Sequence, residues 1–224
     1  MKHKPTEEKP YHTNGTDRIL FASDFHLNDK RQDLMHEIFG RVPGKNHAYD
    51  AMKSMDEQSK FKSDYTVYFL GDMILEGEEG CVSNHNKYFK EVVKGYRDFH
   101  FIRGNHDDEK SYKTLFKGKP LHDHIDIPFC FEDFMVCARL THKPMVIPEV
   151  VYSDNPSAPY PIVLNVHGHL HNLAKIESVL PQYNVSMEKE MEKGSPLVSL
   201  MGTVEDQKEK IRAYIGSLIK LGFY

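Results

Sequence analysis

The chain has 224 residues, enough for one domain with a well-buried core. Its net charge is −4 and its basic residues are scattered, which disfavours an extended nucleic acid as the partner. No apolar run approaches the length that crosses a bilayer, and the polar first 16 residues lack the apolar segment of a secretory signal.

The sequence indicates a single domain without a disulfide framework. We expect a flexible tail over residues 1–16 and a single domain over residues 17–224, without internal repeats. The three cysteines, Cys81, Cys130 and Cys137, form no C-x-x-C pair and are too few for a disulfide framework. This content fits a reducing compartment, so a cytoplasmic location is expected.

The first half of the chain alternates between strand and helix patterns. Residues 18–22 (RILFA) and 65–70 (YTVYFL) are apolar or β-branched runs that predict buried strands. Apolar residues recur at helical spacing over residues 83–96, which predicts a helix with one core face. The other elements expected in this half are helices at 32–39 and 48–61 and a strand at 99–102.

Paired strands follow in the second half. Runs at 128–131 and 134–140 predict a hairpin around Glu132 and Asp133. A proline-rich surface loop at 148–161, a strand at 162–166, short β-like pieces at 182–187 and 196–200, and a solvated turn or strand edge at 188–193 come next. Strands that alternate with helices and then pair with one another indicate a mixed α/β sandwich.

A helix closes the chain. Thr203 and Asp206 form a capping box that predicts a helix from about residue 204 to 221, ended by Gly222. Its buried stripe is expected to consist of Ile211, Tyr214, Ile215, Leu218 and Ile219.

Five short motifs carry acids, histidines or an asparagine, and each directly follows a strand-like run. They are Asp24-Phe25-His26, Gly71-Asp72, Gly104-Asn105-His106-Asp107, Thr141-His142 and Gly168-His169-Leu170-His171. In sheets of this kind, ligands gather at the carboxyl ends of the strands. We therefore expect the five motifs to meet in one site.

The side chains in these motifs suit hard divalent metals, which prefer carboxylate oxygen and imidazole nitrogen. Asp24 and His26 alternate along extended backbone, so both point the same way and one metal can take both. The same spacing in His169 and His171 allows that pair to be divided between neighbouring metals. The remaining donors are the two oxygens of Asp72, which can bridge, the amide oxygen of Asn105 and the ring of His142.

Charge indicates the reaction. Two divalent ions bring four positive charges, of which Asp24 and Asp72 cancel two. The surplus attracts an anionic phosphate and acidifies a bridging water, so that hydroxide is available for in-line attack near neutral pH. His106 is not needed as a ligand and is expected to stabilise the phosphorus centre or protonate the leaving oxygen, with Asp107 orienting it.

In kind and order the motifs resemble those of the calcineurin-like metallophosphoesterase superfamily, over residues 18 to about 171. They are similar to its D-x-H, G-D, G-N-H-[DE], isolated His and G-H-x-H motifs in turn. The resemblance implies a four-layer α/β/β/α sandwich with His106 as the catalytic histidine. It also implies a first metal on Asp24, His26 and His171, a second on Asn105, His142 and His169, and Asp72 between them.

Two departures narrow the branch of the superfamily. Leu75 stands where the second motif often has an acid, and Asp107 stands where the protein serine/threonine phosphatases have Glu. Both favour the compact bacterial and phage-type branch. The resemblance therefore implies hydrolysis of phosphodiesters or small phosphomonoesters, including nucleotides, without a membrane partner. Mn²⁺ is the first expectation for the metals, with Fe, Zn²⁺, Ni²⁺ and Mg²⁺ as alternatives.

Other readings stay open. The same chemistry would serve a nuclease or cyclic-nucleotide phosphodiesterase acting on short substrates, and the same fold would serve a non-catalytic scaffold. Taken singly, His26, His142 and His169 are ordinary core or turn histidines. We expect His167 to be a strand histidine outside the ligand set and His122 and His124 to be surface residues.

Overall fold

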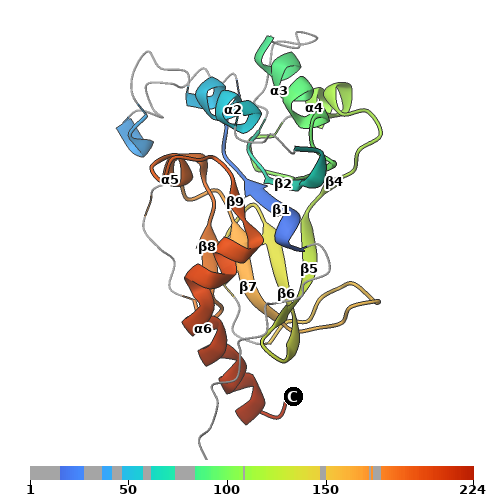
Figure 1. Cartoon of the computed structure of the whole chain (residues 1–224), viewed down its shortest axis with the longest axis vertical. Helices are drawn as coiled ribbons and strands as arrows, with labels where there is room; N and C mark the ends of the chain where they lie inside the picture. The colour runs from blue at the N-terminus through green and yellow to red at the C-terminus, as the bar shows by residue number, and fades with distance from the viewer. Residues whose placement is uncertain are drawn as a thin grey trace, which may run out of the picture.

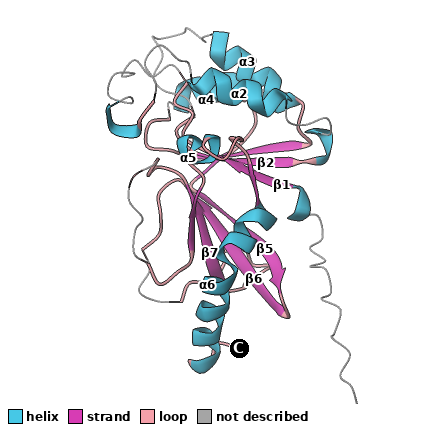
Figure 2. Cartoon of the chain, turned by 60° about the vertical axis from the view of Figure 1, so that its left-hand side comes forward, coloured by secondary structure: helices cyan, strands magenta, loops and turns pink. Residues whose placement is uncertain are grey.

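The computed structural model describes residues 16–27, 37–41, 47–57, 62–73, 84–107, 109–146, 150–171, 173 and 178–224. Two β-sheets face each other across a common core, and helices cover their outer sides (Figures 1 and 2). The expected α/β/β/α sandwich is confirmed.

The first sheet has the strand order β4-β3-β2-β1-β9. Neighbouring strands from β4 to β1 are parallel, and only β9 runs antiparallel to β1. The strands are β1 (Ile19–Ala22), β2 (Thr66–Leu70), β3 (Asp98–Ile102), β4 (Leu121–His122) and β9 (Val198–Ser199). Because β1, β2 and β3 are parallel, the first three motifs leave the sheet at the same edge.

The second sheet has the order β5-β6-β7-β8. Its strands are β5 (His124–Phe131), β6 (Phe134–Thr141), β7 (Ile162–His167) and β8 (Gln182–Asn184). The predicted hairpin is confirmed, because β5 and β6 are antiparallel around a turn at Glu132 and Asp133. Since β6 and β7 are parallel, the last two motifs also emerge side by side.

Alternation along the strands of the first sheet builds two cores. Phe21 and Leu70 point into the core between the sheets, where they meet the second sheet and the last helix. Val67 and Phe69 point the other way and pack beneath the helices that cover the opposite side of this sheet. Both faces of these strands are therefore buried, which explains why their sequences are continuously apolar.

Helices form the two outer layers. They are α2 (His47–Glu57), α3 (Asn84–Lys94), α4 (Glu109–Leu115), α5 (Met187–Met191) and α6 (Leu200–Lys220), with short 3₁₀ turns η1 (Thr16–Arg18) and η2 (Lys62–Asp64). Figure 1 shows α2, α3 and α4 together above the first sheet, while α6 runs beside the second. In α2, Ala48, Ala51, Met52 and Met55 make the buried face at helical spacing.

The last helix differs from its prediction in two respects, namely its first residue and one member of its buried stripe. It begins at Leu200, because the Ser199 hydroxyl accepts a hydrogen bond from the Gly202 amide at 2.9 Å and caps it. The Thr203 hydroxyl instead donates back to the Ser199 carbonyl, so Thr203 is not the cap. Ile219 is exposed, which corrects its place in the stripe, whereas Gly222 does follow the helix with a φ of +84°.

Two other segments were predicted wrongly. Residues 188–193, expected as a solvated turn or strand edge, lie largely within α5, where Glu190 is buried. Helix α4 and strand β4 were not predicted at all. Both helices are short and charged, so their sequences carry too little apolar periodicity to indicate a helix.

Some predictions fall outside the described residues. These concern the tail apart from Thr16, most of the helix expected at 32–39, and the positions of Leu75 and Cys81. Of the cysteines that are described, Cys130 and Cys137 are both free. No helix among the described residues is long and apolar enough to span a membrane.

Candidate metal centre

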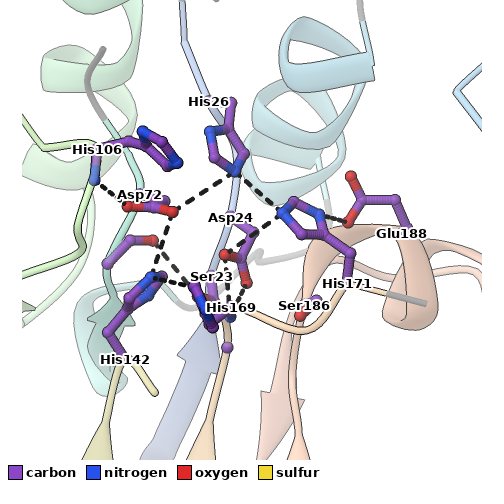
Figure 3. Close-up of polar contacts among 12 residues, drawn as sticks. Ser23, Asp24, His26, Asp72, His106, His142, His169, His171, Ser186 and Glu188 are labelled. Carbon is purple, nitrogen blue, oxygen red and sulfur yellow. Dashed lines mark hydrogen bonds and ion pairs between the residues drawn. The ribbon is translucent and has the colours of Figure 1, made fainter. Parts of the chain in front are cut away.

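The five motifs converge where the carboxyl ends of the strands meet, as Figure 3 shows. Asp24 and His26 follow β1, Asp72 follows β2, and His106 follows β3. His142 follows β6, while His169 and His171 follow β7. Segments from both sheets therefore contribute to one site, as expected from the parallel strands.

One group of possible ligands consists of Asp24, His26 and His171, all of them buried. The Nε2 atoms of His26 and His171 lie 3.2 Å apart, and His171 Nε2 lies 3.9 Å from Asp24 Oδ1. The backbone amide of His169 donates to both Asp24 oxygens, at 3.1 and 3.0 Å, and this fixes the carboxylate.

A second group consists of Asp72, His142 and His169. His142 Nε2 lies 3.2 Å from Asp72 Oδ2, 3.2 Å from His169 Nδ1 and 2.9 Å from Asn105 Oδ1. Asn105 is exposed, so this group is open to solvent on one side, whereas His142 and Asp72 are buried.

Asp72 joins the two groups. Its Oδ2 lies 3.2 Å from His142 Nε2 in the second group and 3.7 Å from His26 Nε2 in the first. Its Oδ1 accepts a hydrogen bond of 2.8 Å from the His106 amide, which sets the plane of the carboxylate. This is the placement that a carboxylate bridging two cations requires.

Hydrogen bonds on the far side of two rings fix the tautomers in the site. His142 Nδ1 lies 2.8 Å from the Leu70 carbonyl, and His171 Nδ1 lies 2.8 Å from Glu188 Oε2. Both partners are acceptors, so each Nδ1 carries a proton and Nε2 is the ring atom that faces the site.

The two Nε2 atoms point at groups that accept hydrogen bonds. His142 Nε2 faces the oxygens of Asp72 and Asn105, and His171 Nε2 faces Asp24 and the Nε2 of His26. Acceptors repel one another at such distances unless a proton or a cation lies between them. The donor set of buried carboxylate and imidazole groups therefore fits divalent metals on both sides of Asp72.

Backbone conformation at five of the possible ligand positions is unusual. Asp24, His26, Asp72, His169 and His171 all have positive φ angles, between +48° and +66°. Among the described residues other than glycine, only Glu132 shares this conformation. Such left-handed residues concentrate at functional sites because the strain persists only where the surroundings enforce it.

A glycine before the last motif allows the strand ends to approach. A Cβ on Gly168 would lie 2.5 Å from Asp24 Oδ2 and 2.8 Å from Ser23 Cβ, closer than atoms can pack. The backbone after β7 can therefore reach the Asp24 carboxylate only without a side chain at this position.

Comparison with known protein families decides the identity of this fold and site. The family model described as calcineurin-like phosphoesterase matches residues 17–207, most of the chain. The chain belongs to this family. This calcineurin-like phosphoesterase is thus a metal-dependent phosphoesterase, and its groups of buried acids and histidines agree with that activity.

Three solved structures resemble the phosphoesterase at low identity. A protein of unknown function from Aquifex aeolicus is 18% identical, with 78% of this chain and 97% of that chain covered and a TM-score of 0.49. YfcE, a phosphoesterase from E. coli, is 19% identical, with 82% of each chain covered and a TM-score of 0.38. Vacuolar protein sorting 29 from Cryptosporidium parvum is 14% identical, covering 74% of this chain and 72% of that chain, with a TM-score of 0.36.

These three similarities are too distant to transfer an activity. No curated protein matches the phosphoesterase.

Charge interactions shift the pKa values of the site histidines in opposite directions. Burial disfavours the charged ring of His26 and lowers its pKa to about 3. Burial opposes protonation of His142 as well, but its hydrogen bond to Asp72 and the nearby carboxylates raise its pKa to about 9. The Asp72 pKa is lowered by the same contacts, against the effect of burial. Of these two histidines, His142 therefore lies where the surrounding carboxylates favour a positive charge more strongly.

His106 borders the two groups without joining either. Its ring centroid lies 5.8 Å from that of His26, and Figure 3 shows the ring beside Asp72. The side chain is only partly buried, so it is accessible from solvent. This location agrees with the expected catalytic role, which stays a prediction.

Asp107 makes contacts that its predicted role did not anticipate. Its carboxylate accepts hydrogen bonds from the backbone amides of Asp72 (3.0 Å), Met73 (2.8 Å) and Gly104 (2.7 Å). It therefore ties the loop after β2 to the loop after β3. Orientation of His106 by Asp107 stays a prediction beside this observed contact set.

Among the histidines outside the motifs, His167 and His124 lie as expected, whereas His122 is half-buried in β4. His167 ends β7, is buried, and directs Nδ1 at the Gly168 carbonyl rather than at either group. His124 is exposed and lies 2.9 Å from Asp154, in a surface cluster that also contains Asp126. Arg139 already neutralises both acids of that cluster, at 2.7 and 3.0 Å, which makes it an unsuitable metal site.

Sequence reasoning missed three residues around His171, two of which contact the ring and one of which acts through Glu188. Glu188 hydrogen bonds to its Nδ1, Arg41 pairs with Glu188, and the Phe39 ring stacks on the imidazole with centroids 3.7 Å apart. Glu188 lies in a run of alternating charges that reads as a solvated segment, and the other two precede no motif. Nothing in the local pattern distinguishes them from surface residues.

Proposed function

We propose that this phosphoesterase uses a binuclear metal centre to hydrolyse phosphodiesters or small phosphomonoesters. The observation that supports the proposal is the position of Asp72, with Oδ2 at 3.2 Å from His142 in one ligand group and 3.7 Å from His26 in the other. A carboxylate shared in this way by two groups of donors is a feature of paired metal sites, and a single metal would not need both groups.

Seven residues would hold the metals. The first would be held by Asp24, His26 and His171, the second by Asn105, His142 and His169, with Asp72 shared. Mn²⁺ is our first candidate, and Fe, Zn²⁺, Ni²⁺ and Mg²⁺ suit the same mixed oxygen and nitrogen donors. Bound divalent cations would supply positive charge for the phosphate oxygens and lower the pKa of water between them.

The side chains around the metals would complete the reaction. His106 lies at the accessible side of the site, where its ring would donate a proton to the leaving oxygen or stabilise the charge on phosphorus. Asp107 would keep the loops of Asp72 and His106 at a fixed separation, because its carboxylate binds amides of both.

Small phosphate esters, including nucleotides, are the proposed substrates. The net charge is −4 and no basic stripe runs along the chain, so a long nucleic acid would find few phosphate contacts. The free thiols of Cys130 and Cys137 agree with a reducing compartment, and we propose the cytoplasm as the location.

A metal-dependent assay tests this proposal. Protein freed of metal with EDTA and then loaded with Mn²⁺ should hydrolyse bis-p-nitrophenyl phosphate or p-nitrophenyl phosphate, and the EDTA-treated protein should not. Cyclic nucleotides and short oligonucleotides in the same panel separate a nucleotide-directed enzyme from a general one. A preparation that holds two metals and hydrolyses none of these compounds would contradict the proposal and favour a scaffold.

Variants assign the roles in the assay. Asp72→Asn should weaken metal retention, because a shared charged donor is lost. His106→Ala should retain both metals and lower turnover about 100-fold, the usual scale of general acid catalysis. His124→Ala, at an exposed histidine outside the motifs, is the matched control and should leave turnover unchanged. If His106→Ala lost its metals and Asp72→Asn kept them, the two roles would be reversed.

A further inference from the structure

A chain of buried polar contacts extends from His171 away from the metal groups. His171 Nδ1 donates to Glu188 Oε2 at 2.8 Å, and Glu188 Oε1 accepts from Arg41 at 2.7 Å (Nε) and 2.5 Å (Nη2). Arg41 Nη2 also donates to the backbone carbonyl of Asp24 at 2.9 Å. The chain of contacts thus begins at one proposed ligand and ends on the backbone of another.

All members of this network are withdrawn from water. The side chains of Arg41, Glu188 and His171 are 3%, 8% and 4% exposed. Burying an ion pair costs desolvation energy that the pairing often does no more than offset, so such a pair is a poor way to gain stability. Its presence next to a proposed metal ligand therefore calls for an explanation through that ligand.

Helix α5 is anchored so that Glu188 meets His171. Ser186, just before α5, forms an isolated parallel bridge with Ser23, just before Asp24. The amide of Met187 donates to the Ser23 carbonyl at 3.1 Å. The first turn of α5 is thereby fixed to the loop that carries the first motif, and Glu188 projects from that turn toward His171 in Figure 3.

We infer that Glu188, held by Arg41, is a positioning residue that sets His171 as a metal ligand. This inference rests on the proposed binuclear centre. Glu188 keeps the proton of His171 on Nδ1, so that the Nε2 lone pair faces the site, and its negative charge makes the imidazole a stronger donor. Phe39, stacked on the ring at 3.7 Å, restricts its tilt.

The two charged partners have separate tasks. Arg41 neutralises the buried carboxylate of Glu188 on the side away from His171. Burial raises the pKa of Glu188, but the His171 hydrogen bond and the charge of Arg41 lower it to about 2. The second donation of Arg41 to Asp24 ties the position of Glu188 to the first motif. A change at either partner should therefore reach the metal through His171.

Metal binding is the measurement that tests this inference. The number of Mn²⁺ ions bound and their dissociation constants would be measured by equilibrium dialysis for the wild type, Glu188→Gln, Glu188→Ala and Arg41→Met. The matched control is Glu190→Gln, because Glu190 lies on the same helix, also has a side chain withdrawn from water and pairs with Lys193 instead. Circular dichroism would confirm that each variant folds.

The affinity for one of the two Mn²⁺ ions should fall by an amount that depends on the variant. We expect tenfold or greater loss of affinity in Glu188→Ala, a smaller loss in Glu188→Gln, where an amide oxygen still accepts from Nδ1, and no change in Glu190→Gln. If Glu188→Ala fails to fold, Glu188→Gln against Glu190→Gln carries the comparison. Equal affinities in the wild type and the Glu188 variants, or equal losses in Glu188→Gln and Glu190→Gln, would overturn the inference.

A double-mutant cycle distinguishes positioning of His171 from general damage. Once His171→Ala has removed the ring, adding Glu188→Ala should cause no further loss of Mn²⁺ affinity. Independent, additive losses would show that Glu188 acts by another route and would overturn the inference. A wild type that binds fewer than two Mn²⁺ ions would instead overturn the proposed binuclear centre.

Discussion

Nε2 of His26 lies 3.2 Å from Nε2 of His171, although 145 positions separate the two residues in the chain. The rings stack with their centroids 5.0 Å apart. Glu188 accepts a hydrogen bond from Nδ1 on the other side of the His171 ring, so Nε2 is the atom that faces the His26 ring. The surrounding loops hold these two nitrogen atoms close together, and this placement favours a cation that both could bind.

Metal removal should lower thermal stability. A ligand that binds only the folded chain stabilises it by about 4 kcal/mol at a concentration 1,000-fold above its dissociation constant. For a domain of this size, that corresponds to a rise of roughly 10 °C in melting temperature. Calorimetry with Mn²⁺ and with EDTA would measure the difference. The double variant Asp24→Asn, Asp72→Asn should show no difference between the two conditions, and a shift of equal size there would place the metal elsewhere.

Metal binding should release a proton from His142. Contacts with Asp72 raise the His142 pKa to about 9, so the ring is charged at pH 7 in the metal-free protein. A metal at Nε2 has to displace that proton, and its affinity should therefore rise with pH by up to about tenfold per unit until pH 9. Titration calorimetry in buffers of different ionisation enthalpy would count the proton.

The sign of the stability effect at His142 follows from the same raised pKa. In EDTA, the stabilising contribution of the charged ring is complete below the unfolded pKa of about 6.5 and is lost as the pH rises through about 9. His142→Asn should remove both this dependence and the proton release. Release that persists in His142→Asn would assign the proton to another group.

Asp107→Ala should destabilise the fold as well as the site. Its carboxylate accepts from three backbone amides in two loops, and hydrogen bonds to a charged group contribute about 1.5–3 kcal/mol each, partly replaced by water when lost. We expect a decrease of about 3 kcal/mol in the free energy of unfolding by urea. Asp133→Asn, in the exposed β5–β6 turn, is the control and should have little effect. A large fall in turnover at unchanged stability would instead favour orientation of His106 by Asp107.

Two glycine substitutions should have opposite effects. Gly168→Ala would bring a methyl group to 2.5 Å from Asp24 Oδ2, and we expect a loss of about 2 kcal/mol in stability together with weaker Mn²⁺ binding. Gly216→Ala, inside α6 with no atom within 4 Å of the new Cβ, should stabilise by about 0.5–1 kcal/mol. Denaturant titration would measure both changes in stability. If Gly168→Ala left stability and Mn²⁺ binding unchanged, the two loops would be able to move apart at no cost, contrary to this prediction.

The sequence predicted the sheets, and which motifs lie together, better than the supporting contacts. Asp72 and His142 are recognisable because each comes directly after an apolar strand, where parallel topology brings chain segments together. Glu188 has no such signal, because its contact with His171 depends on how Ser186 pairs with Ser23 across the two sheets. Tertiary contacts of this kind leave no periodic pattern in the chain.

Helix boundaries show a related limit. The start of α6 is set by Ser199, which serves both as the end of β9 and as the helix cap. The sequence offers a second plausible cap at Thr203, and only the pairing of Val198 with Phe21 in the sheet selects between them. A local pattern with two consistent solutions is resolved by the strand next to it.

The left-handed backbone at five proposed ligand positions limits how this site can change in evolution. At positions 24, 26, 72, 169 and 171, β-branched residues would be strained and Asp, Asn, His or Gly are tolerated, whether or not a cation is bound. A homologue that had lost metal binding would therefore still tend to keep residue types that can bind a metal at these positions. Asn105 and His142 carry no such backbone constraint, so in distant homologues the residues at positions 105 and 142 would report more faithfully on a retained metal.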